Sequence, residues 1–290
     1  MKLMEDNDLL IIMPRESGEK ENARLAQVLD KALANVTPKF LSSAAETEQY
    51  LLAHPVAQGA PFARVLFAAD LGDDGINLEL SRLLSMLRHH PHLLEGWLGG
   101  VIIDAQSELY TKSMAQELVL AANMSGCAFV GCSLVEGTGT LRNFTVAAHK
   151  LGTDNLMDAY VDGACHLVEA VMTFEGYRRA MPKLTVLHAS NHKTSNTFAL
   201  WHAVSAELEG FAIEEIGLRN GAVQDCAGCP YKACLHFGEK ESCFYGGVMV
   251  DNVYPSIKTA NAIVMVCPNY NDAISANLTA FINRLTALYR

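Results

Sequence analysis

No stretch of this 290-residue sequence is long and apolar enough to cross a membrane, because a membrane helix needs about 18 consecutive apolar residues. Runs of like charge and low-complexity tracts are also lacking, which excludes a disordered chain. Basic residues are scarce: 22 Lys and Arg stand against 32 Asp and Glu, and the formal net charge is -10. An acidic chain of this kind lacks the clustered cations with which sequence-independent nucleic-acid binders neutralise phosphates. We therefore expect neither a nucleic-acid partner nor a membrane partner.

A secretory signal is likewise not recognisable at the amino terminus. The residues MKLMEDNDLLIIMP place acidic side chains ahead of a short apolar run, whereas a signal peptide has a basic segment and a longer run. Eight cysteines in a long chain without an export signal point to metal or redox chemistry rather than to a disulfide framework. These features predict a cytoplasmic protein.

Half of the residues are apolar, and short β-type runs alternate with helical patterns. This alternation is typical of parallel sheets that helices cover on both faces. For the first half we predict strands at 9–13, 38–41, 64–68, 100–103 and 128–131, and helices at 23–34, 78–88, 112–124 and 155–174. The pattern restarts near Pro182, with strands at 184–189, 212–216 and 262–267 and helices at 197–209 and 274–289.

The two halves have the layout of diverged copies of one unit. The segment ADLGDDGINLELSRLLSMLR follows the third strand of the first half, and CPNYNDAISANLTAFINRLT follows the third strand of the second half. The second copy lacks two further strands, so its third strand would be an unprotected sheet edge. We expect the first half or another subunit to cover this edge, which makes a homo-oligomer the expected assembly.

A polar loop separates the strand at 184–189 from the next helix. A strand that leads through such a loop into a helix amino terminus presents free N–H groups and the positive end of the helix dipole, so it can bind a phosphate monoester. The motifs G-x-G-x-x-G and G-x-x-x-x-G-K-S/T are both absent there. The alternative is a solvated turn in which Asn196 or Thr197 caps the helix. The candidate donors are Ser190, His192, Lys193, Thr194, Ser195, Asn196 and Thr197.

Four of the eight cysteines lie within eighteen residues in the pattern C-x2-C-x4-C-x8-C. They are Cys226, Cys229, Cys234 and Cys243. Four thiolates at this spacing can converge on one tetrahedral metal or on one cubane cluster. Three interpretations remain open: a 4Fe-4S cluster, a structural zinc ion, or unligated cysteines beside a cofactor loop. The other four cysteines fit buried positions on strands and helices.

Two motifs resemble those of the flavodoxin-like NAD(P)H-dependent FMN reductases, and in particular the iron–sulfur flavoproteins. That family has G-S-P-R-x-x-G-N-T after its first strand, and the loop ASNHKTSNT is identical to it at Ser190, Asn196 and Thr197, while His192 replaces Arg and Ser195 replaces Gly. The family's second motif is S-P-V-Y-F-G-x-x-S-A-x-L-K-A-F-I-D-R. Here CPNYNDAISANLTAFINR matches it at Pro268, Tyr270, Ser275, Ala276, Leu278, Ala280, Phe281, Ile282 and Arg284.

The resemblance covers residues 183–290 and implies a bound FMN. Its phosphate would lie on the loop of residues 190–197, and its ring would lie beside Pro268, Asn269, Tyr270, Asn271 and Asp272. The resemblance also implies a 4Fe-4S cluster on the four clustered cysteines, with NAD(P)H or a protein as electron donor and an acceptor that the motifs do not identify. The segment Phe244–Ile257 then corresponds to connecting structure between the cysteines and the third strand.

The first half resembles this family only in architecture. Its segment PRESGEKENAR stands in the place of the phosphate loop and AADLGDDG stands in the place of the flavin loop, and the acidic residues in both would repel a phosphate. We therefore predict a degenerate flavodoxin-like domain without flavin over residues 1–180, followed by an FMN-binding flavodoxin-like domain with a cysteine cluster over residues 181–290.

The functional expectation is an FMN-dependent oxidoreductase that moves reducing equivalents from NAD(P)H or a protein donor to an acceptor. The alternative is a flavodoxin-like scaffold without catalysis that senses redox state or binds a partner. The short second sheet favours the alternative, because two strands that usually frame a flavin site are missing.

Overall fold

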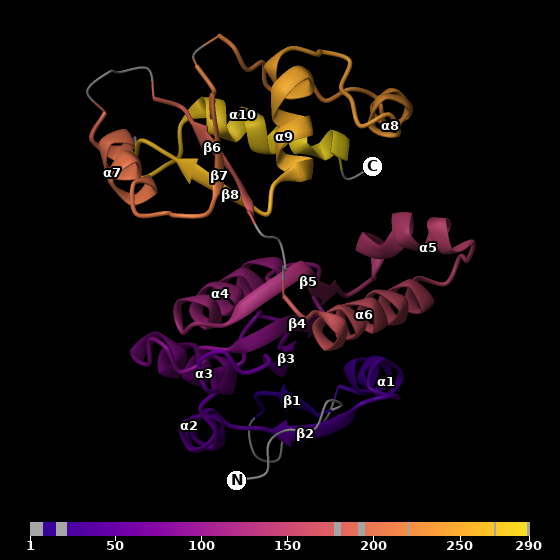
Figure 1. The fold of residues 1–290 in the computed structure, drawn as a ribbon. Coiled ribbons are helices and arrows are strands. Elements are labelled where there is room, and N and C mark those ends of the chain that lie inside the picture. Colours follow the sequence, from indigo (N-terminus) through magenta and orange to yellow (C-terminus); the bar gives the residue numbers. More distant parts are fainter. Residues whose placement is uncertain are drawn as a thin grey trace. The chain divides into compact units, whose positions relative to one another are not determined.

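A computed structural model describes residues 8–15, 22–176, 181–190, 195–219, 221–269 and 271–288. The chain divides into two compact units, Met1–Gly176 and Tyr177–Arg290. Each unit has its own parallel sheet and its own interior, so each is described by itself (Figure 1). No helix in the described part of the chain is both long and apolar enough to cross a bilayer.

The first unit alternates strands and helices from its first described residue. Its elements are β1 (Asp8–Ile12), α1 (Ala23–Ala32), β2 (Thr37–Leu41), α2 (Ala44–Ala53), β3 (Ala63–Leu71), α3 (Leu78–His89), β4 (Trp97–Ala105), α4 (Thr111–Met124), β5 (Ala128–Gly137), a 3-10 turn (Arg142–Phe144), α5 (Thr145–Leu151) and α6 (Leu156–Thr173). All its strands pair in parallel, in the order β2-β1-β3-β4-β5. This is the flavodoxin-like order, which confirms the predicted fold class.

Strand β4 is the most enclosed element of this sheet, and all nine of its residues are buried. Because helices cover both faces of a parallel sheet, the side chains on both faces of a central strand are buried. The sequence of such a strand can therefore be apolar throughout and need not alternate between apolar and polar residues. One apolar cluster contains Val101 and Ile103, and the cluster on the opposite face contains Ile102. Gly100 lets α6 approach closely, because a Cβ atom there would lie 2.9 Å from Cδ1 of Leu167. The glycine in the apolar run therefore serves packing.

A buried ion pair closes the carboxyl end of this sheet. Asp104, near the end of β4, is fully buried, and Arg24 of α1 donates to it through Nη2 at 2.8 Å and through Nε at 3.0 Å. Asn22 caps α1 and donates through Nδ2 to both Asp104 and Asp70. Arg24 also donates to the carbonyl oxygens of Ala105 and Gly139. The position where the sheet's strand ends converge is thus occupied by an internal polar network.

The second unit has the same layout with fewer strands. Its elements are β6 (Lys183–His188), α7 (Asn196–Ser205), β7 (Ala212–Gly217), α8 (Tyr231–Gly238), a π turn (Met249–Val253), α9 (Tyr254–Thr259), β8 (Ala262–Val266), α10 (Ala276–Arg284) and a 3-10 turn (Leu285–Leu288). The strands pair in parallel in the order β7-β6-β8. The predicted three-stranded second sheet is therefore confirmed.

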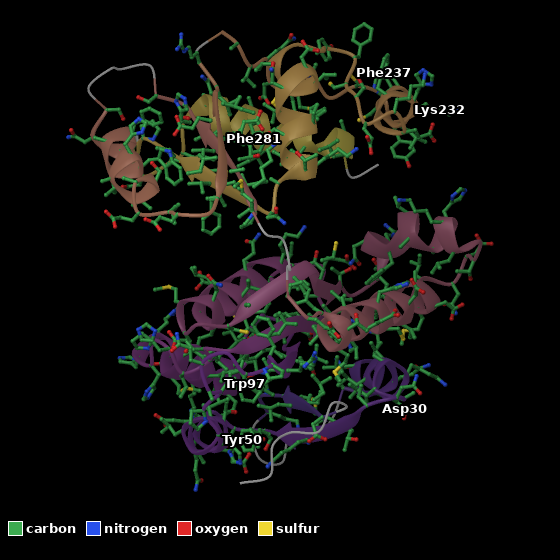
Figure 2. All side chains as sticks on the ribbon, viewed as in Figure 1. Asp30, Tyr50, Trp97, Lys232, Phe237 and Phe281 are labelled. Carbon is green, nitrogen blue, oxygen red and sulfur yellow. The ribbon has the colours of Figure 1, made fainter. Side chains whose placement is uncertain are left out.

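Helices lie on both faces of this smaller sheet (Figure 1). Trp201 of α7 packs with Val186 and Val266 on one face. On the other face, Tyr254 of α9 and Phe281 of α10 pack with Leu187, and Figure 2 shows Phe281 inside the unit. The sheet is consequently the middle layer of three.

The sequence did not predict several short helices. The segment Phe244–Ile257, interpreted as connecting structure, in fact contains the π turn and most of α9, whose Met249, Val253 and Tyr254 are buried in the core. Pro255 in the first turn of α9 was a usable signal, because proline is tolerated at a helix start. Helix α2 was also missed, although Ser43 caps it by accepting from the backbone N–H of Glu46.

The Arg24 and Asp104 pair predicts a stability effect that an exposed pair lacks. Arg24→Ala leaves the buried carboxylate of Asp104 without its cation, so the free energy of unfolding of the first unit should fall by about 3 kcal/mol. The control is Arg88→Ala, which removes the half-exposed pair of Arg88 with Glu117 and should cost less than about 1 kcal/mol.

Each unit holds one tryptophan, Trp97 in the first and Trp201 in the second. In a Trp201→Phe background, urea unfolding followed by tryptophan fluorescence therefore reports the first unit alone. Equal losses for the Arg24 and Arg88 variants would show that the buried pair contributes no more than a surface pair.

Candidate functional site

The candidate site is built around the carboxyl end of β6, the central strand of the second sheet. Residues 184–187 of β6 are buried and fix the strand between β7 and β8. At its end, the carbonyl oxygen of His188 accepts from the backbone N–H of Leu218 at 2.7 Å, just beyond β7. The chain leaves the sheet at Ala189 and Ser190, so the loop of residues 190–197 starts from a firmly held strand end.

Helix α7 begins where this loop ends. Ser195 is its N-cap, and its Oγ accepts from the backbone N–H of Phe198 at 3.3 Å. Asn196 and Thr197 form the exposed first turn, which contains no acidic residue. A helix start of this kind carries partial positive charge and unpaired N–H groups. The candidate donors His192, Lys193 and Thr194 lie outside the described residues.

His188 is a further polar group at this strand end. Its Nδ1 is buried and has no hydrogen-bond partner among the described residues, and its ring packs on Phe198 with centroids 4.5 Å apart. Burial lowers the pKa of His188, so the imidazole is neutral near pH 7. Nδ1 is thus free to bond a ligand or a water molecule, which would remove the cost of an unpaired buried polar atom.

The segment after β8 makes the second half of the candidate site. Asn271 and Asp272 both have left-handed backbone, with φ of 51° and 57°. Such φ values are uncommon outside glycine and turn the chain sharply between β8 and α10. Pro268 is half-buried, Asn269 is exposed, and Tyr270 lies outside the described residues.

The start of α10 lies close to the end of β7. The side-chain amide of Asn277 donates to the carbonyl oxygen of Leu218 at 2.6 Å, and Leu218 is itself bonded to His188. Ser275, the N-cap of α10, has a buried Oγ without a partner among the described residues. The carboxyl ends of β6 and β7 and the start of α10 are therefore joined at one edge of the sheet, where α/β folds bind ligands.

The four clustered cysteines line one pocket of about 260 Å³. Cys226 and Cys229 lie in the loop before α8, Cys234 lies on α8, and Cys243 follows it. The remaining wall is largely apolar and includes Phe237, which Figure 2 labels on α8.

Two residues attach this pocket to the rest of the unit. Asp225 accepts from the backbone N–H of Cys226 at 2.7 Å and from the side-chain amide of Asn283 at 3.0 Å, and these bonds tie the cysteine loop to α10. Arg284 also lines the pocket and is only 4% exposed. Its Nη2 donates to the carbonyl oxygen of Gly246 at 2.9 Å, whereas its Nε has no partner among the described residues.

A buried guanidinium next to four thiols makes the pocket favour a negatively charged occupant. Burial of a cation is unfavourable unless a negative group compensates it, and thiolates or a thiolate-bound metal group would do so. In the described residues, however, no three cysteine, histidine or acidic side chains lie close enough to hold a metal ion. The donor set and the cavity suit a thiolate-bound group, but the ligand geometry is not preformed.

Sequence reasoning missed His188 and Asp225 and assigned no role to the orphaned Oγ of Ser275 or to the buried Arg284. Arg284 gave a usable signal, because it falls three residues after Phe281 on the apolar side of α10 and should therefore be buried. His188 and Ser275 gave none, since only the packed structure shows that their polar atoms are buried without partners.

A comparison with protein families agrees with this geometry in one part of the chain. The family model described as NADPH-dependent FMN reductase matches residues 182–290. Neither the curated proteins nor the solved structures gave a match. The matched range contains the polar loop, the segment after β8 and all four clustered cysteines. Residues 182–290, which make up most of the second unit, are accordingly similar to the NADPH-dependent FMN reductase family.

Proposed function

We propose that the second unit binds FMN and that the chain is an oxidoreductase supplied with electrons by NAD(P)H or by a protein donor. The observation that carries the proposal is the acid-free helix start of α7, directly after the central strand β6, within the residues that match the FMN reductase family model. A terminal phosphate is the ligand that such a helix start prefers.

Ser195, Asn196 and Thr197 would then hold the phosphate, together with Ser190 and His192. Because His188 is neutral near pH 7, it adds a hydrogen bond and no charge, and the helix dipole of α7 supplies part of the attraction. Pro268, Asn269, Tyr270, Asn271 and Asp272 would border the ring. The left-handed turn at Asn271 and Asp272 exposes backbone groups that can bond to ring heteroatoms.

When bound, FMN supplies the hydride and electron chemistry, and the protein supplies binding and orientation. Because the flavin carries out the chemistry, the protein needs no acid–base side chain for it. The acceptor is a separate molecule whose identity these residues do not define. Eight free cysteines suit a reducing compartment, and we accordingly place the protein in the cytoplasm.

Flavin titration tests the proposal and the predicted difference between the two units. The full chain should bind one FMN, because the polar network of Arg24 and Asp104 occupies the equivalent strand ends of the first unit. Anaerobic addition of NADH or NADPH should then bleach the yellow complex. A second equivalent of bound FMN would refute the predicted asymmetry, and a chain that remains colourless in excess FMN would refute flavin binding altogether.

The phosphate loop can be tested with an isosteric change. Thr197→Val replaces the hydroxyl by a methyl group, and the loss of one donor to a charged oxygen should weaken FMN binding about tenfold to a hundredfold. Thr145→Val makes the same change at the start of α5 in the first unit and should leave the Kd unchanged. Fluorescence titration gives both constants, and equal Kd values for the two variants would remove Thr197 from the site.

We further propose that the cysteine pocket holds a 4Fe-4S cluster, with structural zinc and unligated thiols as the alternatives. Four thiols and a buried arginine around one cavity support the proposal. A cluster so placed would carry single electrons between the flavin and an outside partner, and no step of flavin reduction depends on it.

Removal of one pocket cysteine distinguishes these alternatives. Anaerobically purified protein should contain four iron and four sulfide per chain, and Cys234→Ser should lose most of both. Cys132→Ser changes an exposed cysteine of the first unit and should lose neither. One zinc per chain in place of iron would establish the structural metal, and a metal-free chain would establish the unligated state.

A scaffold without catalysis is the second candidate function. The short second sheet supports it, because within the described residues β8 is an edge strand with exposed side chains, whereas β3 of the first unit pairs on both sides. A scaffold would remain colourless with FMN and would show no NAD(P)H oxidation, so the flavin titration also distinguishes this alternative.

A further inference from the structure

The first unit exposes four large apolar side chains at the carboxyl end of its sheet. Ile76 and Leu78 follow β3, and both are 54% exposed. Leu109 and Tyr110 follow β4 and are 61% and 49% exposed. Because β3 and β4 pair in parallel, both segments leave the sheet at the same edge. We call these four residues the apolar platform.

The two segments of the apolar platform are in contact. The ring of Tyr110 lies on Gly75, where a Cβ atom would come within 2.4 Å of Cγ of Tyr110. Gly75 also has a φ of 80°, so glycine is needed there both for its backbone and for the space that it leaves. Helices α3 and α4, which begin beside the two segments, pack against each other (Figure 1). The apolar platform is therefore a joined surface feature rather than a set of scattered side chains.

Tyr110 adopts a backbone conformation that a bulky side chain rarely takes. Its φ is 75°, in the left-handed region, and it is the N-cap of α4 without a side-chain hydrogen bond to the helix. This conformation provides no cap and leaves half of the side chain exposed. Backbone strain is found at functional sites, and tyrosine is a common central residue of protein interfaces. Both features indicate that the apolar platform contacts another molecule.

Exposed carboxylates accompany the apolar platform. Asp73 and Asp74 directly precede Gly75, and Glu108 directly precedes Leu109; all three acidic residues are exposed. Hydrogen bonds from Thr140, which follows β5, lower the pKa of Glu108, so its carboxylate is charged at neutral pH. The bond from the backbone N–H of Thr140 also joins the segment after β5 to the segment after β4. The apolar side chains thus lie among fixed negative charges.

The negative charge of the chain is concentrated in this unit. Residues 1–176 contain 23 of the 32 Asp and Glu but only 12 of the 22 Lys and Arg, whereas acidic and basic residues nearly balance in residues 177–290. Two cations at the platform edge already interact with acidic side chains. Lys112 pairs with Glu136 at 3.5 Å, and Arg142 attracts Glu108. A partner that approaches this edge therefore meets a negative potential.

We propose that the apolar platform is a docking surface for a different protein, one whose surface carries Lys and Arg around an apolar centre. Docking buries the four apolar side chains, and Asp73, Asp74 and Glu108 meet the partner's cations at the rim. Other occupants are disfavoured by the same charges. Nucleic acids and anionic membranes are negative, and a second copy of this chain would bring an identical acidic edge.

The inference concerns the first unit and does not depend on FMN or on the cysteine pocket. Because Arg24 and Asp104 fill the strand ends of this unit, a ligand cannot insert between them. The segments that follow the strands remain exposed and offer a surface contact instead. The competing arrangement is that the second unit of the same chain covers the apolar platform. In that case an added partner protein finds no surface to bind.

Cytochrome c serves as the probe, because its lysines surround an exposed apolar haem edge. Calorimetric titration of the full chain with cytochrome c should show binding at low ionic strength that weakens as salt is added. Asp73→Lys should raise the Kd at least about tenfold. Asp30→Lys makes the same charge change late in α1, toward the opposite end of the sheet, and should change the Kd less than about twofold (Figure 2). Equal Kd values for the two variants would reduce the binding to general charge attraction and overturn the proposal.

The apolar contribution is tested without a change of charge. Leu109→Ser should raise the Kd about threefold to tenfold, whereas Leu120→Ser, at a 54% exposed position within α4, should leave it unchanged. Circular dichroism checks that all four variants remain folded. An unchanged Kd for Leu109→Ser, or no binding of cytochrome c even at low ionic strength, would overturn the proposal. Self-association of the chain that Leu109→Ser abolishes would assign the apolar platform to a second copy and would also overturn it.

Discussion

Parallel pairing of β6 with β7 and β8 is the constraint from which the candidate site follows. Because parallel strands end at the same edge, the segments after β6 and β8 leave the sheet on one side. The hydrogen bonds from Leu218 to His188 and from Asn277 to Leu218 then hold strand ends and helix start together. Both segments therefore begin at the same edge of the sheet because the strands are parallel.

The two units show how one strand order can support different chemistry. In the first unit, Arg24 and Asp104 pair inside the strand ends, and the carbonyl oxygens around them are bonded to the same guanidinium. In the second unit, polar atoms of His188 and Ser275 are buried without partners among the described residues. The first unit also buries unpaired polar atoms, those of Trp97, Glu136 and Tyr160, so unpaired atoms alone do not distinguish the two units. What distinguishes the first unit is the pair of Arg24 and Asp104 that occupies its strand ends.

Much of this arrangement was predictable from the sequence, because apolar periodicity locates buried strands and long helices reliably. The strands β6, β7 and β8 and the polar loop after β6 are examples. Short helices such as α9 were not predictable in this way, since their stability comes from packing of Tyr254 and Val253 rather than from local pattern. The burial of Arg284 beside the cysteines depends on contacts far apart in sequence, and Asp225 acquires its role only through Asn283 of α10.

The central claim is that the helix start of α7 binds the phosphate of FMN. A crystal of the full chain soaked in excess FMN tests it most directly. The account predicts phosphate density against the backbone of residues 195–197, with the ring beside residues 268–272. Flavin density elsewhere, or an empty α7 start in a crystal that has taken up FMN, would contradict it.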